Sequence, residues 1–341
     1  MVDDIAAIGK CGADSVELNA IVNAKVRSKF LEFGTNKCFS LHVGKNNHQC
    51  SELFAQDSKL KKVTEVKYLG NIISEDGNNN KNIEDRWKKG MGIISSVTAI
   101  LNEVSLGKHY FNIGLLFRET NIINGILTCA EVWNNVTQNQ IERLESVDET
   151  YLRSLFGAPA TTTKEALYIE TGKLPIRFIV SMRRLMYWWH LTKEDKSSML
   201  FKFYSAQESK AVKGDWMKLL EKDKKDLGIE LSDDELFEEY KTKYSIKKYL
   251  DKKVKIAAQQ CLYNRKIQHT KLDIIVFTEL KCEKYLLDGR ITKREEKLLF
   301  KLRTRKYFVK SNYKKMYNFN LFCELCKSQI CDQQHLLQCS D

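Results

Sequence analysis

Apolar residues that recur every three or four positions predict helices over most of the chain. In the first run, Asp14 and Glu17 have the spacing of a capping box, and Gly34 would end the helix. Its apolar face would consist of Leu18, Val22, Val26, Phe30 and Phe33. We therefore expect a long amphipathic helix near the start of the chain.

An alternating pattern follows and predicts strands. The apolar side chains of Phe39, Leu41 and Val43 would share one face. Cys38, Ser40 and His42 would share the other. A second strand pair is predicted from Val66 to Ile73, and the Asp76-Gly77 pair after it is typical of a tight reversal.

Three further runs have helical spacing. They cover residues 83–101, 110–133 and 141–155, and the last is broken by Gly157-Ala158-Pro159. We expect most tryptophans here to be core residues. Arg183 and Arg184 would occupy a solvated helix face or contact a phosphate. After Thr192, composition predicts a charged connector followed by solvated acidic helices.

Length and composition fit an intracellular protein of two or three domains, in the nucleus or cytoplasm. The chain has 341 residues, only two prolines and ten cysteines. No apolar run suits a signal peptide or membrane span, because Arg118 and Glu119 interrupt the longest one. In such a compartment the cysteines would be reduced thiols or metal ligands.

Positive charge is concentrated near the C-terminus. Of the net charge of +12, residues 251–341 contribute 20 Lys/Arg against 10 Asp/Glu. Basic side chains interleaved with aromatic ones suit single-stranded or structured RNA, although an ordinary lysine-rich helix has the same composition. The predicted nucleic-acid contacts are Arg290, Lys293, Arg294, Lys297, Lys301, Arg303, Arg305 and Lys306.

The most specific local motif is Cys323-x2-Cys326-x8-His335-x3-Cys339. Three thiolates and an imidazole at this spacing fit a tetrahedral Zn²⁺ site. Metal binding would stabilise this short segment, which has few apolar residues of its own. Cys331 is a fifth candidate ligand that would be able to replace one of the four.

Adjacent carboxylates at Asp3 and Asp4 begin the chain, before a strand-like run of apolar residues. Paired aspartates are common on solvated turns, but they also suit Mg²⁺, which prefers oxygen ligands and shares them with phosphates. Two-metal nucleotidyl transfer needs carboxylates held in this way. A nearby lysine would offset charge on the leaving pyrophosphate, although a lone lysine also suits a solvated surface.

Taken in order, Met1-Val2-Asp3-Asp4, Thr35-Asn36-Lys37-Cys38 and Lys67-Tyr68-Leu69-Gly70 resemble the reverse transcriptases of non-LTR (LINE-like) retrotransposons. The resemblance implies that Asp3 and Asp4 are the Mg²⁺-binding catalytic carboxylates and that Lys37 faces the phosphates. It also implies that Tyr68, Leu69 and Gly70 form a primer-grip hairpin, with an RNA template and a DNA primer as partners.

Segments further along are similar to the same family. They are Cys129-Ala130-Glu131-Val132-Trp133, Leu152-Arg153-Ser154-Leu155-Phe156-Gly157, Glu170-Thr171-Gly172-Lys173-Leu174-Pro175-Ile176, Arg183-Arg184-Leu185 and the Cys-Cys-His-Cys motif. The His-to-Cys gap is one residue shorter than the family's usual form.

The expected fold is mainly α with a small α+β N-terminal part. By resemblance, residues 1–79 would be the end of a polymerase palm and 80–191 a helical thumb. Residues 192–250 would be a charged connector, 251–319 a basic helical region and 320–341 a zinc knuckle.

A complete polymerase also needs a third aspartate from an upstream palm strand, whereas this sequence begins inside the catalytic box. We therefore expect a fragment of an RNA-directed DNA polymerase that is inactive alone. The alternatives are a zinc-knuckle protein that binds nucleic acid without catalysis, and a relic without a selected function. The sequence leaves the oligomeric state open.

Overall fold

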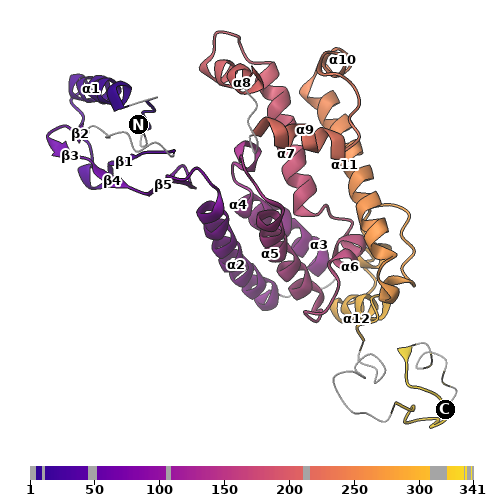
Figure 1. Ribbon diagram of the computed structural model, residues 1–341. Helices are drawn as coiled ribbons and strands as arrows, with labels where there is room; N and C mark the ends of the chain where they lie inside the picture. The colour runs from indigo at the N-terminus through magenta and orange to yellow at the C-terminus, as the bar shows by residue number, and fades with distance from the viewer. Residues whose placement is uncertain are drawn as a thin grey trace. The chain divides into compact units, whose positions relative to one another are not determined.

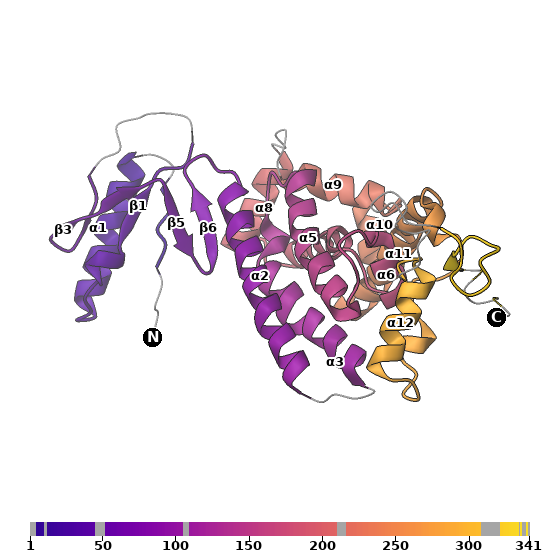
Figure 2. The ribbon, with the colours of Figure 1, turned by 90° about the horizontal axis from the view of Figure 1, so that it is seen from below.

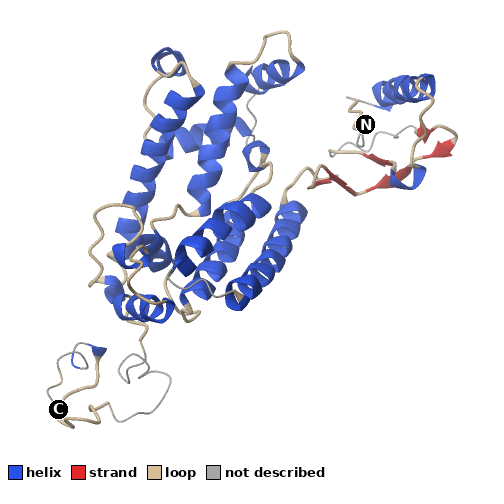
Figure 3. Cartoon of the chain, turned by 180° about the vertical axis from the view of Figure 1, so that it is seen from behind, coloured by secondary structure: helices blue, strands red, loops and turns tan. Residues whose placement is uncertain are grey.

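The computed structural model describes residues 5–9, 12–44, 52–104, 109–209, 216–307, 321–333, 335 and 339 (Figure 1). Its chain divides into two compact units, residues 1–85 with 133–136 and residues 86–132 with 137–341. We call these the N-terminal unit and the helical unit. Strands gather in the N-terminal unit, and helices dominate the rest (Figure 3). This confirms the prediction of a mainly helical chain with a small N-terminal sheet part.

The N-terminal unit contains three two-stranded sheets beside α1. Strands β1 and β4 pair in parallel, whereas β2 with β3 and β5 with β6 are antiparallel. The elements are α1 (Gly12–Ser28), η1 (Thr35–Lys37), β1 (Phe39–Leu41), β2 (Phe54–Ala55), β3 (Ser58–Lys59), β4 (Lys61–Val63), β5 (Glu65–Tyr68) and β6 (Asn71–Ser74).

Helix α1 is shorter than its apolar pattern predicts. It begins at Gly12, so Asp14 lies inside the first turn. There its carboxylate still interacts favourably with the positive end of the helix dipole. The helix ends at Ser28 because Phe30 adopts a left-handed conformation, and the Leu31 amide bonds the Val26 carbonyl (3.1 Å). This is the Schellman arrangement, with Phe30 in the position where glycine is usual. The prediction that Gly34 ends the helix was therefore wrong.

The β5–β6 hairpin reverses at Leu69-Gly70, where Tyr68 pairs directly with Asn71. Both turn residues have positive φ values, 45° and 79°, which are the signs of a type I′ turn. Asp76-Gly77, predicted as the tight reversal, instead forms a turn after β6. The I′ conformation matches the twist of the strands even though leucine is an unusual residue for it.

The helical unit contains most of α2 and all later helices. Its elements are α2 (Asn80–Glu103), α3 (Tyr110–Phe117), η3 (Arg118–Ile123), α4 (Asn124–Ile126), η4 (Ala130–Val132), α5 (Gln138–Phe156), α6 (Lys164–Thr171), α7 (Ile176–Thr192), α8 (Met199–Ser209), α9 (Trp216–Asp226), α10 (Asp233–Glu239), α11 (Lys243–Lys266), η5 (Thr270–Leu272), η6 (Lys284–Leu286) and α12 (Lys293–Arg303). The three helical runs predicted between residues 83 and 155 are present, and the second is broken into short pieces.

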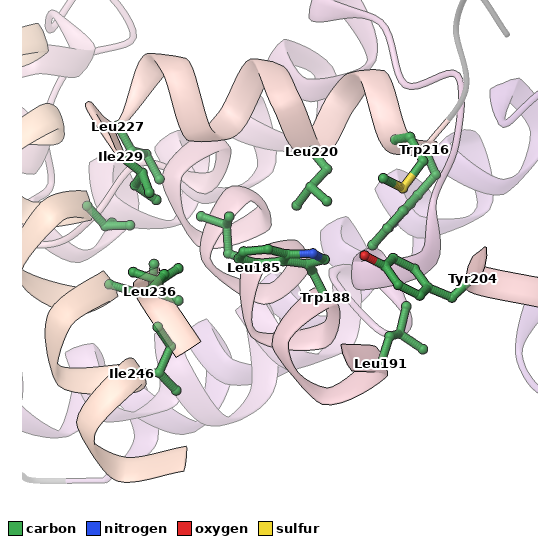
Figure 4. Close-up of a cluster of buried hydrophobic side chains, with 13 residues drawn as sticks. Leu185, Trp188, Leu191, Tyr204, Trp216, Leu220, Leu227, Ile229, Leu236 and Ile246 are labelled. Atoms are coloured by element: carbon green, nitrogen blue, oxygen red, sulfur yellow. The ribbon is translucent and has the colours of Figure 1, made fainter. Parts of the chain in front are cut away.

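One hydrophobic cluster joins α7 to α8, α9, α10 and α11 (Figure 4). Trp188 lies within it, and the Lys224 ammonium sits 4.0 Å from the centroid of its ring. The cluster consists of Leu185, Trp188, Leu191, Tyr204, Trp216, Met217, Leu220, Leu227, Ile229, Leu236, Ile246, Leu250 and Val254. Residues after Thr192 therefore complete this core, although their composition suggested a connector and solvated helices.

Arg183 and Arg184 do not form a solvated pair. Arg184 is buried and forms an ion pair with Asp223 of α9, whose carboxylate also accepts from Ser181 (2.7 Å). Arg183 donates to the Leu127 carbonyl (2.5 Å) and to the Asn124 side chain (2.9 Å). These roles were missed from the sequence because the partners of the two arginines, Asn124, Leu127 and Asp223, all lie outside α7.

A second buried region joins α3, α5 and α12, which are labelled in Figure 2. The rings of Phe156 and Phe300 stack with centroids 3.8 Å apart, and Phe111 lies against Phe156 at 4.9 Å. On the same helix as Phe300, the Glu296 side chain is fully buried, and within the described part of the chain neither carboxylate oxygen has a hydrogen-bond partner. Helix α12 is thus fixed by aromatic packing at the expense of one buried carboxylate.

Charged groups also meet inside the helical unit. Arg118, at the start of η3, makes two hydrogen bonds to the carboxylate of Asp148 on α5, at 2.7 and 2.6 Å. The Tyr168 hydroxyl donates to the same carboxylate (3.1 Å), and Arg118 also donates to the Leu174 carbonyl (2.9 Å). Because Arg118 and Asp148 are both buried, each satisfies the charge of the other.

Candidate metal centre

The C-terminal motif folds as a short hairpin. Phe322 and Ile330 form an antiparallel bridge, and the Cys323 amide donates to the Gln329 carbonyl (2.8 Å). Between them the chain turns tightly, with the Lys327 amide bonded to the Cys323 carbonyl (2.9 Å) and Lys327 in a left-handed conformation. This knuckle brings Cys323 and Cys326 to the same side of the hairpin.

Four side chains converge beside the knuckle. The ligand atoms of Cys323, Cys326, His335 and Cys339 all lie within 4.8 Å of one another. Cys326 Sγ is 3.2 Å from His335 Nε2, and Cys323 Sγ is 4.0 Å from Cys339 Sγ. The structure thus confirms that the four predicted ligands come together, as a cluster with the composition of a zinc site.

These distances suit one tetrahedral ion. Two thiolates bound to the same Zn²⁺ lie about 3.8 Å apart, and a thiolate and an imidazole about 3.6 Å apart, given the usual bond lengths. The observed separations of 4.0 and 3.2 Å fall close to both values. Four protein ligands would fill the shell, so such a site would be structural, with no open position for a substrate.

The surroundings favour thiolates. Backbone amides of Cys326 and Leu325 donate to the Cys323 sulfur and lower its pKa. The hydroxyl and amide of Ser328 do the same for Cys326 and lower its pKa to about 6. Hydrogen bonding to the Cys323 sulfur raises the pKa of His335. Amide donors to sulfur are a feature that supports metal-binding thiolates.

Asp332 and Cys331 make hydrogen bonds that hold the backbone beside the cluster. Asp332 accepts a hydrogen bond from the His335 amide (2.7 Å), which fixes the backbone at that ligand. Cys331 lies outside the convergent group, and its amide closes the hairpin by bonding the Leu321 carbonyl (2.7 Å). The geometry therefore selects His335 and Cys339, and leaves Cys331 as part of the hairpin.

The residues predicted for polymerase chemistry are placed only in part. Asp3 and Asp4 lie outside the described residues. Lys37 is the last residue of η1, and its side chain is exposed. Tyr68, Leu69 and Gly70 occupy the β5–β6 turn, with the Leu69 side chain 63% exposed at the tip. Within the described part of the chain, the Cys/His group is the one cluster of at least three potential metal ligands.

The predicted basic residues separate into two groups. Three arginines form ion pairs within the chain: Arg290 with Asp288 (2.7 Å), Arg303 with the buried Glu170 (2.9 Å), and Arg305 with Asp273 (2.9 Å). Arg303 also pairs with Glu283 (3.0 Å). For Arg303 the structural role is clear, because it neutralises a carboxylate with no exposed surface.

The remaining basic residues have no carboxylate partner among the described ion pairs. Lys293 and Lys297 lie over the ring of Tyr110, with ammonium-to-centroid distances of 3.7 and 5.1 Å. Lys306 donates to the Thr161 hydroxyl (3.2 Å). Tyr110 was missed as a contact of the basic segment, and no local signal would have found it, since it lies on α3, far away in the sequence.

Comparisons of the chain with protein-family models, curated proteins and solved structures found no match. In the part of the chain that the structure describes, no helix combines the length and apolar character needed to cross a bilayer.

Proposed function

We propose that this chain is the C-terminal portion of a non-LTR retrotransposon reverse transcriptase, in which its zinc knuckle and basic segment hold nucleic acid. RNA-directed DNA polymerisation with Mg²⁺ would be the activity of the intact enzyme. The observation that carries the proposal is the convergence of Cys323, Cys326, His335 and Cys339 within 4.8 Å. That ligand order was expected from the family resemblance.

Two further features support it. The Tyr68-Leu69-Gly70 segment occupies a tight hairpin turn with an exposed apolar tip, a form suited to contacting a substrate strand. Directly after this hairpin the chain continues into helices, in the order that the palm-and-thumb interpretation requires.

Cys323, Cys326, His335 and Cys339 would hold the zinc ion, which would crosslink the hairpin to the segment after it. The protein's own groups prepare the site: amide donors stabilise the thiolates, and Asp332 fixes the backbone at His335. A rigid knuckle next to a basic segment is able to contact both bases and backbone of RNA.

Zinc content and RNA binding test the proposal together. The purified chain should contain one equivalent of zinc, and Cys326→Ser should lose the metal and weaken RNA binding at least tenfold. Cys331→Ser is the matched control, since Cys331 lies outside the cluster, and it should keep both properties. A metal-free wild-type chain, or equal loss of zinc in both variants, would refute the assigned site.

A binding module without catalysis is the second candidate, and the Cys/His cluster favours it equally. Primer extension with Mg²⁺ and an RNA template separates the two. Incorporation that Asp3→Ala abolishes would reject the binding-only function. Salt-sensitive RNA binding without incorporation is expected of both, because the fragment is expected to be inactive alone.

A further inference from the structure

Helix α12 presents a row of cations that form no ion pair with a carboxylate in the described part of the chain. We call Lys293, Arg294, Lys297 and Lys301 the α12 cation stripe. At 100° per residue these positions cover an arc of about 100°, beside the buried face that carries Glu296 and Phe300. The stripe is about 12 Å long, from eight residues at 1.5 Å each.

The stripe contrasts with the arginines around it. In the described part of the chain no ion pair connects any of its members to a carboxylate, whereas Arg290, Arg303 and Arg305 are all paired. Burial, with a smaller contribution from the positive charges of Lys293 and Lys301, lowers the pKa of Lys297 to about 8. Like charges held close together without counter-charge create a strong positive potential.

Its geometry is held in advance of any partner. Lys293 and Lys297 are fixed over Tyr110, and the stacking of Phe300 on Phe156 fixes the helix beneath them. Ordering these side chains before binding reduces the entropy that a partner must overcome. Burial and, to a smaller extent, the positive charge of Lys271 lower the pKa of Lys306, so the positive region extends beyond the helix.

A nucleic-acid backbone fits this surface better than a membrane does. Membrane-binding helices insert an apolar face, but the apolar face of α12 is buried against α5. Four cations within about 12 Å suit the dense negative charge of a nucleic-acid backbone, which in a duplex is about one charge per 3.4 Å of axis for each strand.

We propose that the α12 cation stripe is the surface on which this chain holds the phosphate backbone of a nucleic acid. The proposal rests on the function proposed above and assigns the contact to specific residues. In this arrangement the paired arginines stabilise the fold, and the unpaired cations contact the partner.

The experiment measures how the affinity for a short mixed-sequence RNA depends on salt. Each lost contact to a single strand should reduce the slope of log affinity against log salt by about 0.7, so loss of all four should reduce it by about 3. At 0.1 M salt the affinity should fall about a hundredfold or more. The test variant carries Lys293→Gln, Arg294→Gln, Lys297→Gln and Lys301→Gln.

A matched control removes the same amount of charge from α11. The four lysines chosen for this control are exposed on α11. The acidic helix α10 lies beside α11, because Tyr240 stacks on Tyr249. The slope should change by less than one unit. The control variant carries Lys247→Gln, Lys248→Gln, Lys252→Gln and Lys255→Gln.

A second variant, Arg294→Gln with Lys301→Gln, leaves the Tyr110 contacts intact. It should reduce the slope by about half as much as the four-residue variant does. Circular dichroism and zinc content establish that each variant is folded. Equal slopes for the α11 and α12 variants, with zinc retained, would show that the α12 cation stripe is not the RNA contact. That result would not contradict the proposed function. Wild-type chain that fails to bind RNA would overturn both.

Vesicles containing phosphatidylserine serve as the probe for a membrane partner. Stronger loss of vesicle binding than of RNA binding in the four-residue α12 variant would overturn the assignment to nucleic acid. Unchanged vesicle binding with weakened RNA binding would support it.

Discussion

Two groups of ionisable side chains in the helical unit are held in different ways. At the junction of α3, α5 and α6, Arg118 and Asp148 have opposite charges and satisfy one another. In the C-terminal hairpin, the ligand atoms of three thiols and an imidazole converge within 4.8 Å of one another. The first arrangement is satisfied by opposite charges within the protein, whereas the second has the composition of a metal site.

The difference lies in what surrounds each group. Arg118 is enclosed by helices with large apolar faces, so packing fixes its position. The hairpin leaves Phe322, Leu325 and Ile330 exposed and so buries few apolar side chains. A metal crosslink would therefore provide the stability that the hairpin lacks, in the same way as in other small metal-binding segments.

Metal removal should have the largest effect and should be confined to the hairpin. Structural zinc in small domains contributes about 10 to 16 kcal/mol of apparent binding free energy. After chelation, the amides of Cys323 and Lys327 should exchange with solvent at the rates of an unfolded chain, while the amides of α5 keep their protection. Hydrogen exchange monitored by mass spectrometry checks this. Slow exchange of the hairpin amides without metal would show that the hairpin is stable without a metal crosslink.

Arg118→Ala should destabilise the helical unit by about 3 to 5 kcal/mol, because it leaves the buried Asp148 carboxylate without its partner. Denaturant unfolding followed by circular dichroism measures the change. Lys281→Ala is a suitable control, since Lys281 and Glu279 form an exposed pair, and it should cost about 0 to 1 kcal/mol. Similar losses in the two variants would show that burial does not distinguish the pairs.

Glu296→Gln should remove a pH dependence. Burial raises the pKa of Glu296 to about 7, above its ordinary value, so the native state binds the proton more tightly than the unfolded state. Wild-type stability from this group should be full below about pH 4.5, should fall as the pH rises towards 7, and should then level off. The total loss corresponds to roughly 3 kcal/mol.

Unfolding at pH 5 and pH 8 checks this prediction. Glu296→Gln should be more stable than the wild type at pH 8 and should differ less at pH 5. Glu238→Gln, at an exposed position on α10, should leave the wild-type pH profile unchanged. A wild-type profile without this decline would contradict the raised pKa of Glu296.

Features set by neighbouring residues were predicted well from the sequence. Periodicity identified the helices around Ile94 and Leu152, and Gly157 ends α5 in a left-handed conformation as its position suggested. The ligand spacing identified the Cys/His cluster, because a knuckle brings Cys323 and Cys326 together within four residues. Such features depend on local backbone geometry, which sequence patterns describe directly.

Features set by distant partners were not predicted. Arg303 pairs with Glu170 across 133 residues, and neither position indicates the other. Asp223 belongs to an acidic block that resembles a solvated helix, yet it is buried against Arg184. The type of side chain limits what a residue can bind, but its partner depends on how the helices pack.

The stacking of Phe300 on Phe156 has a consequence for the order of events during translation. Helices α5 and α6 leave the ribosome long before α12 has been synthesised. Phe156 and Glu170 therefore lack their contacts with Phe300 and Arg303 until then. Until residues 293–303 emerge, the nascent chain exposes an apolar surface of the kind that chaperones bind. Completion of the core is thereby linked to synthesis of the same helix that carries the cation stripe.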